Sequence, residues 1–222
     1  MRRRMTWLDV PEAGGACDVP PGSVDALAAS IPTGARIWLR EASDAARTHV
    51  PARVVVVEDA AGPAARWSPP APWRVSLRVT GEVVVPIDGP DDPAATRLVA
   101  ALVRRADLDP AGFRAHWLGV HGPLNRDTPA VRAHVVRYEQ LCCEPDPAGE
   151  PGAPPVDGVT VQWFGSPEAF YRFATDRAAR DVLAADEDRF LDMGRLVWML
   201  VRGEILRGPA RPSSAASPGP RR

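Results

Sequence analysis

The chain has 222 residues, of which 45% are apolar, so it can bury a sizeable core in one large domain or two small ones. Its formal net charge is −1 and its basic residues are all arginine, so no overall positive charge draws it to nucleic acid or an anionic membrane. The three cysteines are too few for a disulfide framework.

The first residues, Met-Arg-Arg-Arg-Met, carry the charge of a secretion signal. The apolar segment that such a signal requires is interrupted at once by Asp9 and Pro11. No apolar run approaches the roughly 20 residues that cross a bilayer. We therefore expect a cytoplasmic protein with neither membrane nor nucleic-acid partners.

The first half predicts strands separated by one helix. In chain order these are a strand at Met5–Val10, a helix at Val24–Ile31 capped by Ser23, strands at Arg36–Glu41 and Arg53–Glu58, and a long strand at Trp73–Pro86. The run of four valines in the third of these strands indicates burial on both faces. The turn-rich segment 87–95 is the best candidate for a domain boundary.

The second half shows clearer helix and strand signals. Strands are predicted at Arg97–Arg105, His134–Cys143, Val159–Phe164 and Arg195–Leu206, and helices at 110–121, after Ser166, and at Asp176–Phe190. Residues 208–222 are rich in Pro, Ser, Ala and Gly and are expected to be disordered.

This β-α-β-β-α-β order is the pattern of an α+β, ferredoxin-like domain with a four-stranded antiparallel sheet. The first half has the same order without a clear second helix, which suggests two copies in one chain. The alternative is that a small α+β domain gives this order by chance. The expected domains are a divergent N-terminal half at 1–86, a linker at 87–95, a second domain at 96–207 and a tail at 208–222.

The segment 109–124 has well-defined helix ends. Asp109 suits the N-cap, Pro110 suits the first helical position, and Gly122 followed by Pro123 suits a helix end. At helical spacing, one face carries Phe113, Trp117, Val120 and His121, with His116 at its edge.

The second half resembles the EthD family of the dimeric α/β-barrel superfamily. Phe113, Trp117, His121, Pro123 and Leu124 are similar to its Phe-x-x-x-Trp-x-x-x-His-x-Pro-Leu signature. Four further stretches follow in the family's order: Arg137–Gln140, Asp157–Phe164, Ser166–Phe170 and Asp186–Asp192. The resemblance covers about residues 96–206.

The resemblance implies two four-stranded sheets that pack into a barrel, with a ligand cavity beside each sheet. In single-domain members two chains supply the sheets, whereas here one chain would supply both as a pseudo-dimer; association into a homodimer is the other reading. Members are linked to xenobiotic degradation and polyketide metabolism and are often labelled oxidoreductases. Superfamily relatives include cofactor-free monooxygenases, cyclases and isomerases.

His121 is the candidate catalytic residue, because histidine titrates near neutral pH and acts as a general acid or base. The alternative is that it only caps the helix end. Candidate ligand-binding residues are Phe113, Trp117, Tyr138, Gln140, Gln162 and Trp163, which would give an apolar pocket a few polar groups. Each of them has core packing as the plainer alternative.

Other polar groups favour structural explanations. Arg137 and Glu139 suggest a surface ion pair, and Asp186, Glu187 and Asp192 suggest a solvated helix end. His116 and His121 are five apart, a spacing that does not place them together on an α-helix, so no metal site and no cofactor is expected. Haem bound through His121 remains an alternative.

These observations support three hypotheses. The first is a cofactor-independent oxidoreductase, cyclase or isomerase that acts on a small apolar, aromatic, xenobiotic or polyketide-like molecule through His121. The second is a non-catalytic ligand-binding accessory protein. The third is a purely structural pseudo-dimer, whose cavity would be filled with side chains.

Overall fold

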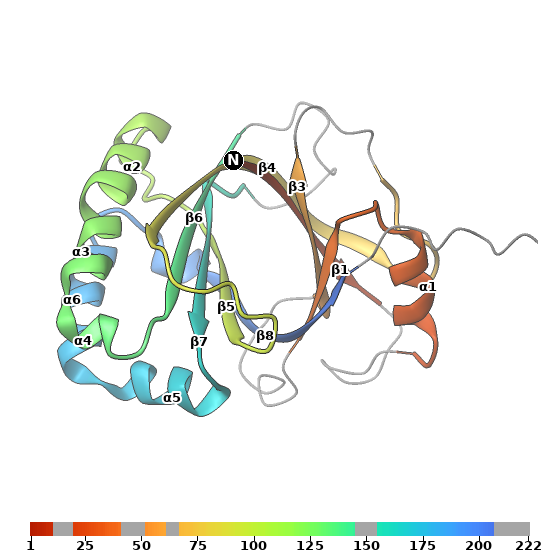
Figure 1. Cartoon of the computed structure of the whole chain (residues 1–222). Helices are drawn as coiled ribbons and strands as arrows, with labels where there is room; N and C mark the ends of the chain where they lie inside the picture. The colour runs from red at the N-terminus through yellow and green to blue at the C-terminus, as the bar shows by residue number, and fades with distance from the viewer. Residues whose placement is uncertain (11–19, 41–51, 61–66, 145–154, 207–222) are drawn as a thin grey trace, which may run out of the picture.

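The computed structural model describes residues 1–10, 20–40, 52–60, 67–144 and 155–206. Its eight strands close into one barrel in the order β1-β3-β2-β8-β5-β7-β6-β4 (Figure 1). The strands are β1 (Arg2–Asp9), β2 (Arg36–Arg40), β3 (Val54–Ala60), β4 (Arg74–Ile87), β5 (Thr96–Leu102), β6 (Arg137–Cys143), β7 (Gly158–Phe164) and β8 (Val197–Leu206). An α+β fold with antiparallel strands in a barrel is confirmed.

The two halves of the chain contribute equal arcs of this barrel. The N-terminal half lies in the order β4-β1-β3-β2 and the C-terminal half in the order β8-β5-β7-β6. In each half the strands therefore follow the same order: fourth, first, third and second. Antiparallel pairing of β2 with β8 and of β4 with β6 joins the arcs. Closure leaves no free sheet edge between the halves.

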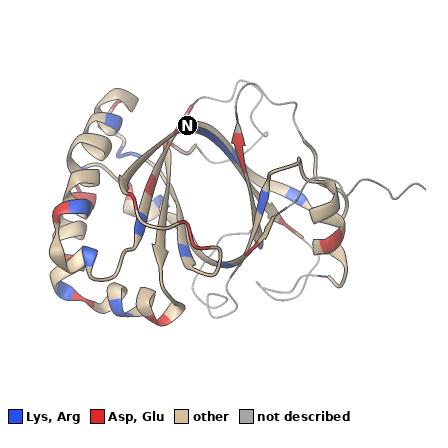
Figure 2. Ribbon diagram, in the orientation of Figure 1, with Lys and Arg blue, Asp and Glu red and all other residues tan. Residues whose placement is uncertain are grey.

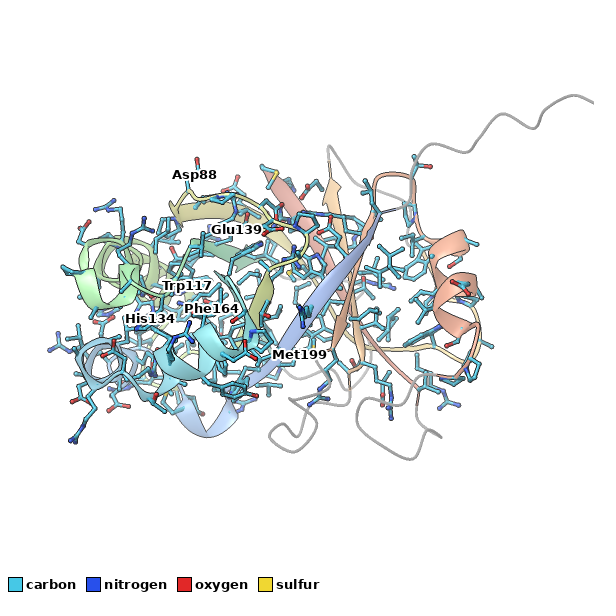
Figure 3. All side chains as sticks on the ribbon, turned by 60° about the horizontal axis from the view of Figure 1, so that its bottom comes forward. Asp88, Trp117, His134, Glu139, Phe164 and Met199 are labelled. Atoms are coloured by element: carbon cyan, nitrogen blue, oxygen red, sulfur yellow. The ribbon has the colours of Figure 1, made fainter. Side chains whose placement is uncertain are left out.

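The barrel interior is a packed apolar core to which all eight strands contribute. Alternation along the strands points one set of side chains inward: Met5, Trp7, Trp38, Val55, Val57, Leu77, Val79, Val99, Ala101, Leu141, Val159, Val161, Trp163, Met199 and Val201. Met199 lies inside the barrel, while Trp117 and Phe164 lie on the helix-covered side of the wall (Figure 3).

An ionic network closes one end of this interior. Arg97 has no exposed surface, and its guanidinium lies 4.9 Å from the Trp38 ring and 5.7 Å from the Trp163 ring. Glu204 and Asp91 neutralise it from 3.5 and 3.9 Å. A buried cation requires such partners, because burial of an unpaired charge is costly.

The predicted surface pair of Arg137 and Glu139 belongs to the same network. Glu139 is only 2% exposed and bridges Arg137 and Arg3. The expectation of a solvent-exposed ladder was wrong, because Arg137 and Glu139 lie on the same face of β6 as Leu141, which points into the barrel interior.

Among the described residues of the N-terminal half, one helix covers the strands. In α1 (Ser23–Ser30), Leu27 is fully buried in a cluster with Leu8, Val54 and Val56. Ser23 does not cap this helix as predicted. Gly22 holds the N-cap position with φ 72°, a left-handed conformation that favours glycine, and the Ser23 hydroxyl donates to the Pro20 carbonyl.

Several helices cover the C-terminal half on the outer side of its strands (Figure 1). They are α2 (Pro110–His116), a π-helical turn (Trp117–His121), α3 (Gly122–Asp127), α4 (Pro129–Arg132), α5 (Pro167–Thr175) and α6 (Arg177–Glu187), followed by a 3₁₀ turn at Met193–Arg195. The predicted caps Asp109 and Ser166 accept from Gly112 and Ala169 N–H groups. Asp176 caps α6 in the same way.

The helix that begins at Pro110 does not end at Gly122 as predicted. Gly122 is right-handed helical (φ −58°, ψ −56°), and its N–H donates to the Trp117 carbonyl five residues earlier. The wider π turn accommodates Pro123, which has no N–H and would crowd a carbonyl in a regular helix. The turn also changes which side chains share a face, and it brings together two histidines five residues apart.

No described helix is long and apolar enough to cross a membrane. Charged side chains of both signs are interspersed over the ribbon in Figure 2. The predicted disorder of residues 208–222 concerns a segment outside the described residues, and Cys17 also lies outside them.

Candidate functional site

A cavity of about 210 Å³ lies between the outer face of the C-terminal strands and the helices that cover it. Its apolar walls are Leu98, Ala100, Leu102, Trp117, Phe170, Phe173, Ala174, Phe190, Leu191, Met193, Leu196 and Trp198. Its polar lining is His121, Thr160, Gln162, Arg180 and Glu187. Such a composition, largely apolar with several aromatic rings and a few polar groups, is typical of sites for small organic ligands.

His121 and His116 share one buried carboxylate. His121 Nδ1 lies 2.9 Å from Asp186 Oδ2, and His116 Nε2 lies 2.9 Å from Asp186 Oδ1. Asp186 and His121 are each 6% exposed, while the His116 side chain is 23% exposed. The cluster therefore runs from the cavity wall to the protein surface.

The two histidines keep Asp186 ionised. Burial by itself would raise the pKa of this carboxyl group, but hydrogen bonds from His121 and His116 outweigh burial and lower the pKa below its usual value. At neutral pH the carboxylate is thus a hydrogen-bond acceptor for both rings.

Aromatic and amide groups fix the orientation of His121. Phe190, which lines the cavity, packs against both imidazoles with ring centroids 4.9 Å from His116 and 5.1 Å from His121. The fully buried Asn125 donates to the His121 carbonyl at 2.9 Å and accepts from Gln162 Nε2 at 3.2 Å. The site is held by side chains from α3, β7 and the segment after α6.

Tyr138 and Gln140 lie beneath the π-helical turn instead of lining the cavity. Gln140 Nε2 donates to the Trp117 carbonyl at 2.9 Å and to the Tyr138 hydroxyl at 3.1 Å. Burial raises the pKa of Tyr138 far above its usual value, so its phenol stays neutral. These two side chains support the wall that carries Trp117.

The predicted site residues therefore separate into two groups. His121, Trp117 and Gln162 line the cavity. Phe113 packs behind Trp117, with ring centroids 5.4 Å apart, and does not reach the cavity. Trp163 lies on the opposite face of β7, inside the barrel, where its indole N–H donates to Asp91 at 3.1 Å.

The sequence predicts a solvated helix end at Asp186, but the structure makes Asp186 a buried functional candidate. The helical spacing contains a signal against that assignment, because Ala179, Leu183 and Asp186 fall on one buried face of α6. For Val120 the prediction was wrong in the other direction. Helical spacing predicts that Val120 is buried, but it is 45% exposed, because the π turn rotates that face of the helix.

The two charged residues that line the cavity form an ion pair on α6. Arg180 lies 3.2 Å from Glu187, and its guanidinium lies 5.5 Å from the Phe173 ring. Within the described ranges, no group of three or more His, Cys, Asp or Glu side chains is arranged to hold a metal ion.

The comparisons with known proteins show a family resemblance in the C-terminal half. Residues 105–194 match the EthD domain. This stretch contains the π-helical turn, both histidines and Asp186, so the predicted resemblance is confirmed where the site lies. A comparison with curated proteins gave no match.

Solved structures share the whole barrel and not the EthD segment alone. An anthrone oxidase-like protein aligns with a TM-score of 0.54 and 8% identity, over 96% of this chain and 97% of its own. A protein described as a major regulator of staphylococcal pathogenesis aligns with a TM-score of 0.52 and 12% identity, over 90% and 98%. An EthD family protein from Bacillus halodurans aligns over 48% of this chain and 95% of its own, with 17% identity and a TM-score of 0.37.

Proposed function

We propose that the protein binds a small, largely apolar aromatic molecule in the C-terminal cavity and that His121 acts on it as a general acid or base. The observation that carries the proposal is an aromatic-lined cavity whose wall holds a histidine paired with a buried carboxylate. Histidine is the side chain that most often serves as a general acid or base in proteins.

The size and lining of the cavity indicate the ligand class. At about 210 Å³ it exceeds the roughly 150 Å³ engineered cavity that binds benzene. Trp117, Phe170, Phe173, Phe190 and Trp198 offer ring surfaces to a planar molecule. A one- or two-ring xenobiotic or polyketide-like compound with an acidic O–H or C–H group fits both the walls and His121.

The proposed chemistry is cofactor-independent. Removal of a proton by His121 would produce an enolate or phenolate, which is the first step in isomerisation, cyclisation or oxygenation. The name of the anthrone oxidase-like structure, which shares the fold, is compatible with such a ligand. The open cavity disfavours a purely structural pseudo-dimer, for which we expected a cavity filled with side chains.

We also propose that the chain is two copies of one ferredoxin-like unit, with 1–86 and 96–207 as the units and 87–95 as the linker. The matching strand order of the two halves supports this. A single chain would then supply both arcs that two chains supply in single-domain relatives.

A panel of one- and two-ring hydroxyarenes, followed by mass spectrometry, tests the proposal. We expect conversion of at least one compound by the wild-type protein. His121→Ala should lower its turnover about 10²–10⁴-fold, the usual contribution of a general acid or base. His134→Gln is the matched control, because His134 pairs with Asp176 and does not line the cavity.

Full turnover by His121→Ala would contradict the assignment of His121. Tight binding without conversion would instead support the alternative, a ligand-binding accessory protein. One observation favours that alternative: the Asp186 pairing also ties the π-helical turn to α6, which is a purely structural task.

A further inference from the structure

The shared carboxylate of Asp186 restricts where both histidines carry their protons. An ionised carboxylate only accepts hydrogen bonds, so each ring nitrogen that faces it must bear a proton. His121 Nδ1 and His116 Nε2 both face Asp186 at 2.9 Å. Neutral His121 is therefore the Nδ1–H form, and neutral His116 is the Nε2–H form.

This tautomer leaves His121 Nε2 with its lone pair. Nε2 makes no hydrogen bond to any side chain or backbone group in the described part of the chain, and the residue lines the cavity. The opposite tautomer would present an N–H group there, and His121 would then be unable to accept a proton from a ligand.

We propose that Asp186 and His116 are positioning residues for His121. Asp186 fixes the tautomer that makes Nε2 a base, and His116 holds the second oxygen of Asp186 from the solvent side. The inference rests on the proposed role of His121. Phe190 supports the arrangement because it packs against both imidazole rings.

The proton-transfer step follows from this arrangement. His121 Nε2 takes a proton from an acidic O–H or C–H bond of the ligand, and the electron pair of that bond stays on the ligand. The imidazolium that forms lies beside the Asp186 carboxylate, which remains ionised and stabilises it. Nε2 later returns the proton to another atom of the ligand or to water.

Asp186→Asn separates this role from simple packing. A carboxamide has one oxygen that accepts and one nitrogen that donates, so it cannot accept from both rings. One of the two histidines must change tautomer, although the size and shape of residue 186 hardly change. A residue that only filled space would tolerate the exchange without a change of tautomer.

The test is ¹⁵N NMR of the imidazole nitrogens in the full-length, ligand-free protein, at a pH where the rings are neutral. In the wild type we expect His121 as Nδ1–H and His116 as Nε2–H. In Asp186→Asn we expect one of them to switch, while His134, paired only with Asp176, keeps its signals. A wild-type His121 with its proton on Nε2, or unchanged tautomers in Asp186→Asn, would overturn the proposal.

Variants of the partly exposed His116 provide a second measurement if Asp186→Asn does not fold. Glutamine keeps an N–H donor for Asp186 Oδ1, so His116→Gln should leave His121 in one tautomer. His116→Ala leaves Asp186 Oδ1 without its donor, so the Asp186 carboxylate can turn away from His121 Nδ1 and His121 should populate both forms. An unchanged His121 in His116→Ala would remove His116 from the positioning role. Because no ligand is used, a failure here is distinct from a failure to find turnover, which would contradict only the proposed function.

Discussion

The two halves of the barrel share a strand order but cover their outer faces differently. In the C-terminal half, α5 and α6 connect β7 to β8 and enclose the cavity. In the N-terminal half, the described residues 67–73 that lead into β4 contain no helix. Two tryptophans take that place: Trp67 and Trp73 donate to the Ser30 and Ser23 carbonyls of α1.

This difference teaches that the barrel wall is common to both halves, whereas the site depends on the second helical layer. Trp73 packs with Leu27, Val54 and Val56 in the apolar cluster under α1. On the matching face of the other half, the helices cover small residues such as Ala100, and a cavity remains between the helices and the strands. The N-terminal half thus completes the fold, and the C-terminal half holds the cavity.

The largest expected effect comes from removing one half. A truncation to residues 94–208 loses the partners of β8 and β6 and exposes interior residues such as Met199 and Trp163. We expect it either to form a homodimer that rebuilds the barrel or to fail to fold. Size-exclusion chromatography with light scattering, together with circular dichroism, distinguishes these outcomes. A stable monomer would contradict the view that the halves form one pseudo-dimeric barrel.

A smaller effect is expected on the pH dependence of stability. The described histidines all lie in the C-terminal half, and two of them bond Asp186. The pKa of Asp186 is lowered in the folded protein, so its contribution to stability is complete above its unfolded pKa of about 3.9. The contribution is lost as the pH falls through the lower, folded-state pKa. At neutral pH, Asp186→Asn should cost about 1.5–3 kcal/mol, the range for hydrogen bonds to charged groups.

Urea unfolding of the wild type and Asp186→Asn at several pH values measures this contribution. The gap between the two free energies of unfolding should narrow as the pH falls below about 4. A gap that stays constant down to the acid limit of the folded state would show that the Asp186 carboxylate is not the group responsible.

Gly158→Ala tests the packing of Trp117, which lines the cavity. A Cβ atom at Gly158 would overlap the Trp117 ring, so the ring must shift. We expect a loss of about 1–3 kcal/mol in unfolding free energy, typical of overpacking, and weaker ligand binding. Gly119→Ala is the matched control, because its Cβ meets nothing within 4 Å and should be neutral or slightly stabilising. Equal behaviour of the two variants would contradict the described packing of Trp117.

The sequence was sufficient to predict most strands and to single out the segment around His121, which borders the C-terminal cavity. Apolar runs such as Val54–Val57 and caps such as Asp109 and Ser166 are local signals, and the structure confirms them. The His121 segment was recognised because its residue spacing is itself a family signature.

The remaining features depend on non-local contacts or on rare backbone geometry. A π turn cannot be anticipated from sequence spacing. Ordinary helical spacing separates His116 from His121 and places Val120 on the buried face, and the π turn reverses both. Strand alternation places Trp163 and Gln162 on opposite faces but does not say which face borders a cavity. The role of Asp186 emerges only when α6 packs on the π-helical turn.

The central claim is that the C-terminal cavity is the ligand site, and a variant that blocks it tests this most directly. Ala174 is exposed and lines the cavity, so Ala174→Trp should block access while changing stability by no more than about 0.5 kcal/mol. Native mass spectrometry of both proteins with the hydroxyarene panel gives the answer. We predict a one-to-one complex with the wild type that is lost in Ala174→Trp. No complex with the wild type, or equal binding by both proteins, would contradict the claim.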